Sequence, residues 1–258
     1  MDNFEVPIDT VLIFLVVLAR AGGLVTFAPF WAHRSVSINI RVISAIVLSV
    51  ALSPFLMNRI EAPDPNMYSL TLVLLGELLI GLLMGYVGRV IFTCFEMAAH
   101  FMGNQMGFSL AGIIDPDTRA QTTTFGIGAQ MLSVVVLLAA NGHHWFVIAS
   151  VRSFEFVQPG NFHVSGELVD ILLRMTASTL AVGLSLAAPA VIVLVVIEFG
   201  LEFFGRTAPQ FQVFILGFPL KIGLGLTILG ASVYFLPTAF RQVLGGIYTG
   251  LDQVIGTL

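Results

Sequence analysis

The chain has 258 residues, of which 57% are hydrophobic and only 10% are charged, with a formal net charge of −4. Soluble domains carry about 25% charged residues, so this composition excludes a soluble protein and indicates an all-α membrane protein with about six helical spans. The weakly acidic balance argues against nucleic-acid binding, and the single cysteine excludes an internal disulfide or a cysteine-based metal cluster.

The first apolar run, about residues 8–28, is expected to be a retained membrane helix, because the acidic segment before it lacks the basic region and cleavage site of a signal peptide. Arg20 lies well inside this run. A charge at membrane depth is costly, so the side chain either reaches the nearer interface or faces protein. The small residues Ala19, Ala21, Gly22 and Gly23 around it favour the second reading, since they allow another helix to approach closely.

A second span is predicted over about 38–57, followed by an acidic, proline-containing loop at 59–66. Apolar or small residues then continue from Met67 to Gly112. At about 1.5 Å per residue these 46 residues would exceed ~60 Å, about twice the hydrocarbon thickness. This run must therefore fold back or leave the bilayer.

Within that run, glycines and polar residues recur at spacings of three or four, which places them on one helical stripe. Gly81 and Gly85 fit the small-x-x-x-small pattern of closely packed membrane helices, as do Gly103 and Gly107. Glu77 shares the stripe and is expected to meet another helix instead of lipid. The stripe predicts a packing face.

The stretch from Phe95 to Thr124 is the most irregular part of the chain. Glycines interrupt it, and Asp115-Pro116 favours a turn. Non-helical backbone between membrane helices is tolerated where protein buries it or where it lines a wet cavity. Two readings follow, namely an ordinary loop outside the bilayer and a re-entrant plug or constriction loop.

Further spans are predicted over about 125–140, 168–197 and 211–235. Pro189 should kink the first of the two longer ones. The only lysine, Lys221, lies inside the last span and is expected to face protein or trapped water. The arginines are too evenly distributed for the positive-inside rule to decide the topology.

The residues do not support an enzyme, a metal site or a cofactor site. Ser109 followed later by His143 could suggest an intramembrane serine protease. Such an enzyme needs a small residue directly after the nucleophilic serine, and Leu110 stands there instead. Neither HExxH nor a phosphate-binding GxxxxGK[ST] occurs. A small-solute or proton-coupled transporter stays as an alternative, because four acids lie in or beside apolar runs, namely Glu77, Glu96, Glu198 and Glu202.

One long motif resembles a known family. The segment 207–223, TAPQFQVFILGFPLKIG, resembles the signature of the FliR family of flagellar type III export-gate proteins, which has injectisome counterparts. Shorter matching stretches occur in the expected order, at 20–29, 76–81, 103–108, 115–116 and 141–144. Each stretch is weak alone, and together they are specific.

The resemblance implies a non-enzymatic, single membrane-embedded domain over 1–258, with no fused FlhB-like domain. It implies assembly with FliP-like and FliQ-like subunits into a closed pore for unfolded proteins, beside FlhA-like and FlhB-like components, in the bacterial inner membrane at the flagellar basal body. It also places a pore plug within 108–124, near methionines whose flexible side chains suit a seal. The expected plug or constriction residues are Met102, Met106, Phe108, Leu110, Ile113, Ile114, Asp115 and Pro116. The expected buried polar or packing residues are Arg20, Glu77, Gly81, Gly85, Gln210 and Lys221.

Overall fold

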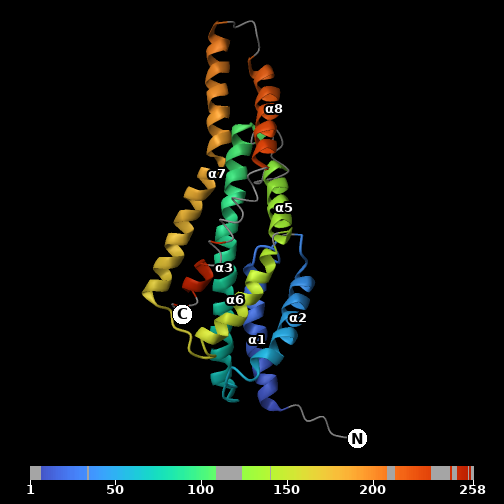
Figure 1. The fold of residues 1–258 in the computed structure, drawn as a ribbon, viewed down its shortest axis with the longest axis vertical. Helices are drawn as coiled ribbons and strands as arrows, with labels where there is room; N and C mark the ends of the chain where they lie inside the picture. Colours follow the sequence, from blue (N-terminus) through green and yellow to red (C-terminus); the bar gives the residue numbers. More distant parts are fainter. Residues whose placement is uncertain are drawn as a thin grey trace. The chain divides into compact units, whose positions relative to one another are not determined.

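The described part of this computed structural model is helical and contains no strand. It comprises residues 7–33, 35–108, 124–139, 141–207 and 213–233, with 245, 249–254 and 256 near the C-terminus. The helices, drawn in Figure 1, are α1 (Ile8–Phe27), α2 (Ile38–Leu56), α3 (Met67–Gln105), α5 (Thr124–Ala139), α6 (Gly142–Phe156), α7 (Gly166–Thr207) and α8 (Val213–Val233).

Among the described residues the structure has four helices that could span a membrane, or five with one bent pair, and about six apolar helical segments in all. Four helices are long and apolar enough to cross a bilayer, namely α1, α2, α3 and α7. Most of α5 and α6 together form a fifth candidate, bent by 68°. The shorter apolar stretch of α8 brings the total to about six, so the all-α membrane class is confirmed.

Local sequence explains the ends of the early helices. Ala28 takes an extended backbone after α1, as expected for a residue that precedes a proline. The hydroxyl of Ser37 accepts a hydrogen bond from the Ile40 N–H and caps the start of α2. The predicted loop at 59–66 is non-helical, and Asn66 Oδ1 accepts from the Tyr68 N–H where α3 begins.

The long third run does not fold back within its described part. α3 continues unbroken for 39 residues to Gln105, and Gly107 just beyond it has φ +90°, a conformation that glycine adopts at little cost. The run was predicted either to fold back or to leave the bilayer, and the prediction that it folds back is wrong for residues 67–105. A straight helix of this length leaves the hydrocarbon at one end at least.

Two other breaks are visible. Asn141 has a left-handed backbone (φ 56°) between α5 and α6, a conformation that asparagine adopts more readily than most residues. α7 runs for 42 residues and remains helical through Pro189. The kink expected at that proline stays a prediction.

The described residues divide into two compact units. The first comprises 1–91, 138–176 and 244–258, and the second comprises 92–137 and 177–243. In the first unit α1 and α2 lie side by side and α6 packs on both (Figure 1). Their contact is an apolar core of Ile13, Val16, Val17, Leu52, Leu56, Ile60 and Phe154. In the second unit α8 runs beside the C-terminal part of α7.

Candidate functional site

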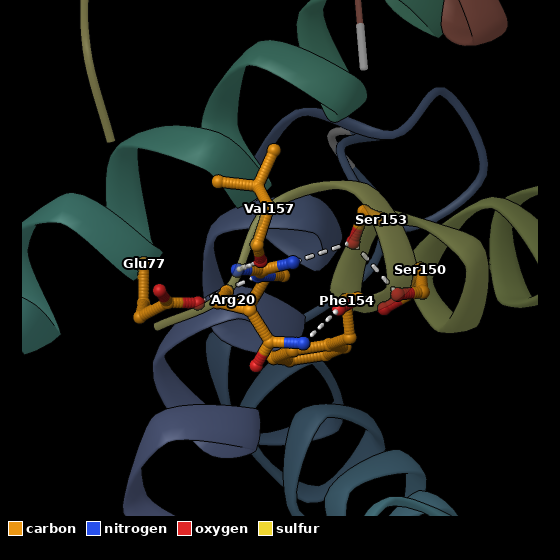
Figure 2. Close-up of polar contacts among 7 residues, drawn as sticks. Arg20, Glu77, Ser150, Ser153, Phe154 and Val157 are labelled. Atoms are coloured by element: carbon orange, nitrogen blue, oxygen red, sulfur yellow. Dashed lines mark hydrogen bonds and ion pairs between the residues drawn. The ribbon is translucent and has the colours of Figure 1, made fainter. Parts of the chain in front are cut away.

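A buried ion pair lies at the centre of the first unit. Arg20 of α1 donates from Nε to Oε2 of Glu77 on α3 at 2.6 Å, and the two side chains are 0% and 1% exposed (Figure 2). Arg20 therefore faces protein and does not reach an interface. Glu77 meets another helix, and its Oε1 is buried without a hydrogen-bond donor among the described residues.

The rest of the guanidinium is held by α6. Arg20 Nη1 donates to the Ser153 hydroxyl at 2.8 Å, and Nη2 donates to the Val157 carbonyl at 3.1 Å. The Phe154 ring lies 3.7 Å from the guanidinium carbon, a cation–π contact (Figure 2). One side chain thus links α1, α3 and α6.

The backbones of α1 and α3 touch next to this pair. A Cβ on Gly81 would collide with the Arg20 carbonyl oxygen, and one on Gly85 would lie 2.8 Å from the Leu24 carbonyl oxygen. From the other side, a Cβ on Gly23 would lie 2.7 Å from the Leu82 nitrogen. Only glycine permits this approach, which brings Arg20 close enough to reach Glu77 directly.

A second polar cluster lies in the second unit, where α3, α7 and α8 meet. Lys221 Nζ donates to Glu198 Oε1 at 2.7 Å, and Gln105 Nε2 donates to Glu198 Oε2 at 2.7 Å. The Lys221 side chain is 17% exposed and that of Glu198 is 43% exposed. Lys221 is thus paired with protein, as its position inside an apolar run led us to expect.

The methionines predicted near a constriction occupy different environments. Met106 is fully buried, and the absent side chain of Gly225 on α8 leaves the space for its thioether. Met102 is half-buried. Gly107 directly follows Met106, and a Cβ on Gly107 would collide with the Phe218 ring of α8, so the glycine backbone packs directly against that ring. The end of α3 is therefore anchored to α8 by packing as well as through Gln105.

Several expected site residues lie outside the described part of the chain. They are Leu110, Ile113, Ile114, Asp115, Pro116 and Gln210. Phe108, at the start of the expected plug, is described and is half-buried. The plug itself stays a prediction.

No group of three or more metal-ligating side chains occurs in the described ranges. The adjacent rings of His143 and His144 lie with their centroids 4.3 Å apart and are not surrounded by further ligands. Ser109 falls outside the described residues, so the geometry of a Ser-His pair is not defined.

Sequence reasoning did not find the partners that α6 supplies to Arg20. Ser153, Phe154 and Val157 follow Arg20 by more than 130 residues, and serine, phenylalanine and valine are ordinary residues of an apolar helix. In the sequence Glu198 is one of four acids in or beside apolar runs, and no motif or spacing relates it to Gln105 or Lys221. No local signal indicates which distant residue each of them contacts.

Comparison with known proteins finds similarity to bacterial export proteins along most of the chain. The model of the family described as bacterial export proteins, family 1, matches residues 11–247. The flagellar biosynthetic protein FliR of Escherichia coli (strain K12) is 26% identical over 241 residues, covering 93% of this chain and 92% of the relative. FliR of Bacillus subtilis (strain 168) is 28% identical and covers 92% of each chain. The Yop proteins translocation protein T of Yersinia pestis is 27% identical over 168 residues, 64% of each chain.

Proposed function

Because this chain belongs to the family of bacterial export proteins, family 1, we propose that it is a core subunit of the flagellar type III protein export gate. In this proposal it assembles with FliP-like and FliQ-like subunits in the bacterial inner membrane, at the flagellar basal body. FlhA-like and FlhB-like components lie beside the assembly. The chain contributes walls and packing contacts to a closed pore for unfolded proteins and performs no catalysis.

The observation that carries this proposal is the extent of the family match. It covers residues 11–247, which include the Arg20–Glu77 pair, the Glu198–Lys221 cluster and the helices α1 to α8 except the first three residues of α1. The Escherichia coli and Bacillus subtilis flagellar relatives cover 93% and 92% of the chain, whereas the Yersinia relative covers 64%. The longer match to flagellar proteins supports a role in exporting flagellar proteins over a role in exporting virulence proteins.

Three of the four acids that suggested a proton-coupled transporter support the export-gate choice instead. Glu77 is held by Arg20, Glu96 accepts from Gln130 Nε2 at 2.6 Å, and Glu198 accepts from both Gln105 and Lys221. A proton path needs acids that exchange partners along a wet route. Here each of these acids is instead held by a guanidinium, an ammonium or an amide of another helix, which is typical of a structural contact between helices.

The proposal includes a closing role for residues 108–124. The end of α3 offers a firm attachment for this segment, because Gln105 and Met106 are fixed to α7 and α8. A plug with a firm attachment can be displaced by a passing chain and return to the same place. This role is our inference from the attachment and from the glycine, proline and apolar residues of the segment.

Deletion and complementation test the proposed function directly. A strain lacking this chain should lose secretion of a flagellar substrate and motility, and the full chain should restore both. The affinity-tagged chain should co-purify with FliP-like and FliQ-like proteins. Normal secretion in the deletion strain, together with purification of the chain alone or as a homo-oligomer, would support the transporter alternative.

A further inference from the structure

A short helical segment near the C-terminus packs onto the first unit. Residues 249–254 are helical and belong to the same unit as α1, α2 and α6 (red, near the label C in Figure 1). Gly250, Leu251 and Val254 are buried, whereas Asp252 is exposed. Because the buried positions are one, three and four residues apart, they lie on one face of the helix. We call residues 249–254 the C-terminal helix.

The buried face of the C-terminal helix meets two long helices at once. A Cβ on Gly250 would collide with the Cε of Met175 on α7, and it would lie 3.3 Å from Cγ1 of Val87 on α3. The missing side chain therefore lets the backbone at position 250 lie directly against both helices. Met175 and Val87 each stand within four positions of the residue at which their helix leaves the first unit. The C-terminal helix thus covers the last turns of α3 and α7 in this unit.

An ion pair ties the same segment to a third helix. Arg152 Nη1 on α6 donates to Asp252 Oδ1 at 3.2 Å. Both side chains are partly exposed, and such pairs contribute little to stability, so the pair sets the position of the C-terminal helix while the buried residues hold it. Arg152 directly precedes Ser153, which binds Arg20. The C-terminal helix therefore contacts α6 next to the candidate site.

The two long helices are neighbours at this level. The hydroxyl oxygens of Tyr86 on α3 and Thr176 on α7 lie 3.0 Å apart, and each residue directly adjoins one that the C-terminal helix contacts. Val87 is only 1% exposed. Since Gly250 lies against Val87, the C-terminal helix is part of the cover over this side chain. Its removal should open Val87 to reagents.

The C-terminal helix lies outside the residues that the family model matches, because the match ends at residue 247. The residues that it contacts on α3, α6 and α7 all lie inside the matched range. The packing of the first unit therefore includes a segment that the comparison with the family does not describe.

We propose that the C-terminal helix is a clasp, which holds α3, α6 and α7 together in the first unit and stays closed in the assembled protein. This inference goes beyond the proposed function and does not depend on it, because every contact that carries it lies within one unit of this chain. Gly250 is the residue that allows the clasp to close, and the Arg152–Asp252 pair sets its position.

The first test locks the clasp with a disulfide in the full chain, in membranes treated with an oxidant. The variant Val87→Cys/Gly250→Cys carries Cys94→Ala as well, so that no other thiol is present. A sulfur in place of Val87 Cγ1 would lie within disulfide reach of a Cβ at position 250. Gly256 supplies the matched control, because a Cβ there meets nothing within 4 Å. The 87–250 pair should form an intramolecular disulfide in several-fold higher yield than Val87→Cys/Gly256→Cys, with recovery of the complex unchanged.

The second test opens the clasp. In a Val87→Cys chain the new thiol is buried and should react slowly with a membrane-permeant maleimide. Adding Gly250→Leu forces a side chain against α3 and α7 and should raise the labelling rate at position 87 several-fold, whereas adding Gly256→Leu should not. Cys94 is buried in the second unit and is the internal reference, so its labelling should stay slow if only the clasp has opened.

The clasp is overturned by equal disulfide yields with positions 250 and 256, by a lock that prevents assembly, or by unchanged labelling at position 87 in the Gly250→Leu chain. An equal rise at position 87 and at Cys94 would also overturn it, because that result means general unfolding. Secretion of a flagellar reporter in the same strains tests the export role separately. A clasp that locks and opens as expected, in cells whose secretion does not need this chain, would overturn the export role and leave the clasp intact.

Discussion

Arg20 and Glu77 are 57 positions apart in the sequence, yet Nε and Oε2 lie 2.6 Å from each other and both side chains are buried. The pair is possible because Gly81 and Gly23 let the α1 and α3 backbones touch. Hence the ion pair and the glycines around it depend on one another. The first two predictions test each part separately.

The first prediction concerns the charge of Glu77. Glu77→Leu leaves the Arg20 guanidinium buried without its counter-ion and should destabilise the protein by about 3–5 kcal/mol. Glu77→Gln keeps a hydrogen-bond acceptor and should cost less. Thermal stability and recovery of the assembled complex in detergent measure both variants. The double variant Arg20→Leu/Glu77→Leu should recover part of the loss, since it removes the unpaired charge; a purely additive loss would contradict the coupling.

The second prediction compares two adjacent glycines of α1. Gly23→Ala should separate α1 from α3, because the new methyl group would meet the backbone at Leu78 and Leu82. Gly22→Ala meets nothing within 4 Å and should be neutral, or stabilising by up to about 1 kcal/mol through helix propensity. Recovery and melting temperature of the complex check the difference. Equal behaviour of the two variants would show that close contact of α1 and α3 is not required.

The third prediction concerns Glu198 and Lys221. Lys221→Met should be milder than loss of Glu77, on the order of 1 kcal/mol, because Glu198 is partly exposed and keeps Gln105 as a donor. The swap Glu198→Lys/Lys221→Glu should recover stability relative to either single charge reversal. A double-mutant cycle on complex stability checks this coupling, and additive effects would mean that the contact contributes nothing.

The fourth prediction tests the proposed plug. Shortening residues 110–117 should leave the complex assembled but raise the leakage of ions and small solutes, because a closing element is removed while the attachment at Gln105 and Met106 is retained. Complex recovery and solute uptake are measured in the same cells. Loss of assembly without leakage would make the segment a scaffold.

Local chemistry was enough to predict much of the fold. Long apolar runs indicated the membrane class, and the acidic, proline-containing stretch at 59–66 indicated a loop between two helices, because proline and turn residues restrict their own backbone. The small residues around Arg20 correctly suggested that another helix approaches it. The motif at 207–223 indicated the family, which the family comparison confirms.

Tertiary structure alone decided which residues meet. Ser153 and Phe154 contact Arg20 from more than 130 positions away, and no periodicity within a helix encodes such a pairing. The composition of 67–112 allowed a hairpin or a long helix, and α3 runs unbroken to Gln105 with Gly81 and Gly85 packed against the α1 backbone. Likewise, a methionine suits a flexible seal or a tight core equally well. Met106 is buried because Gly225, more than 100 positions later, leaves room for it.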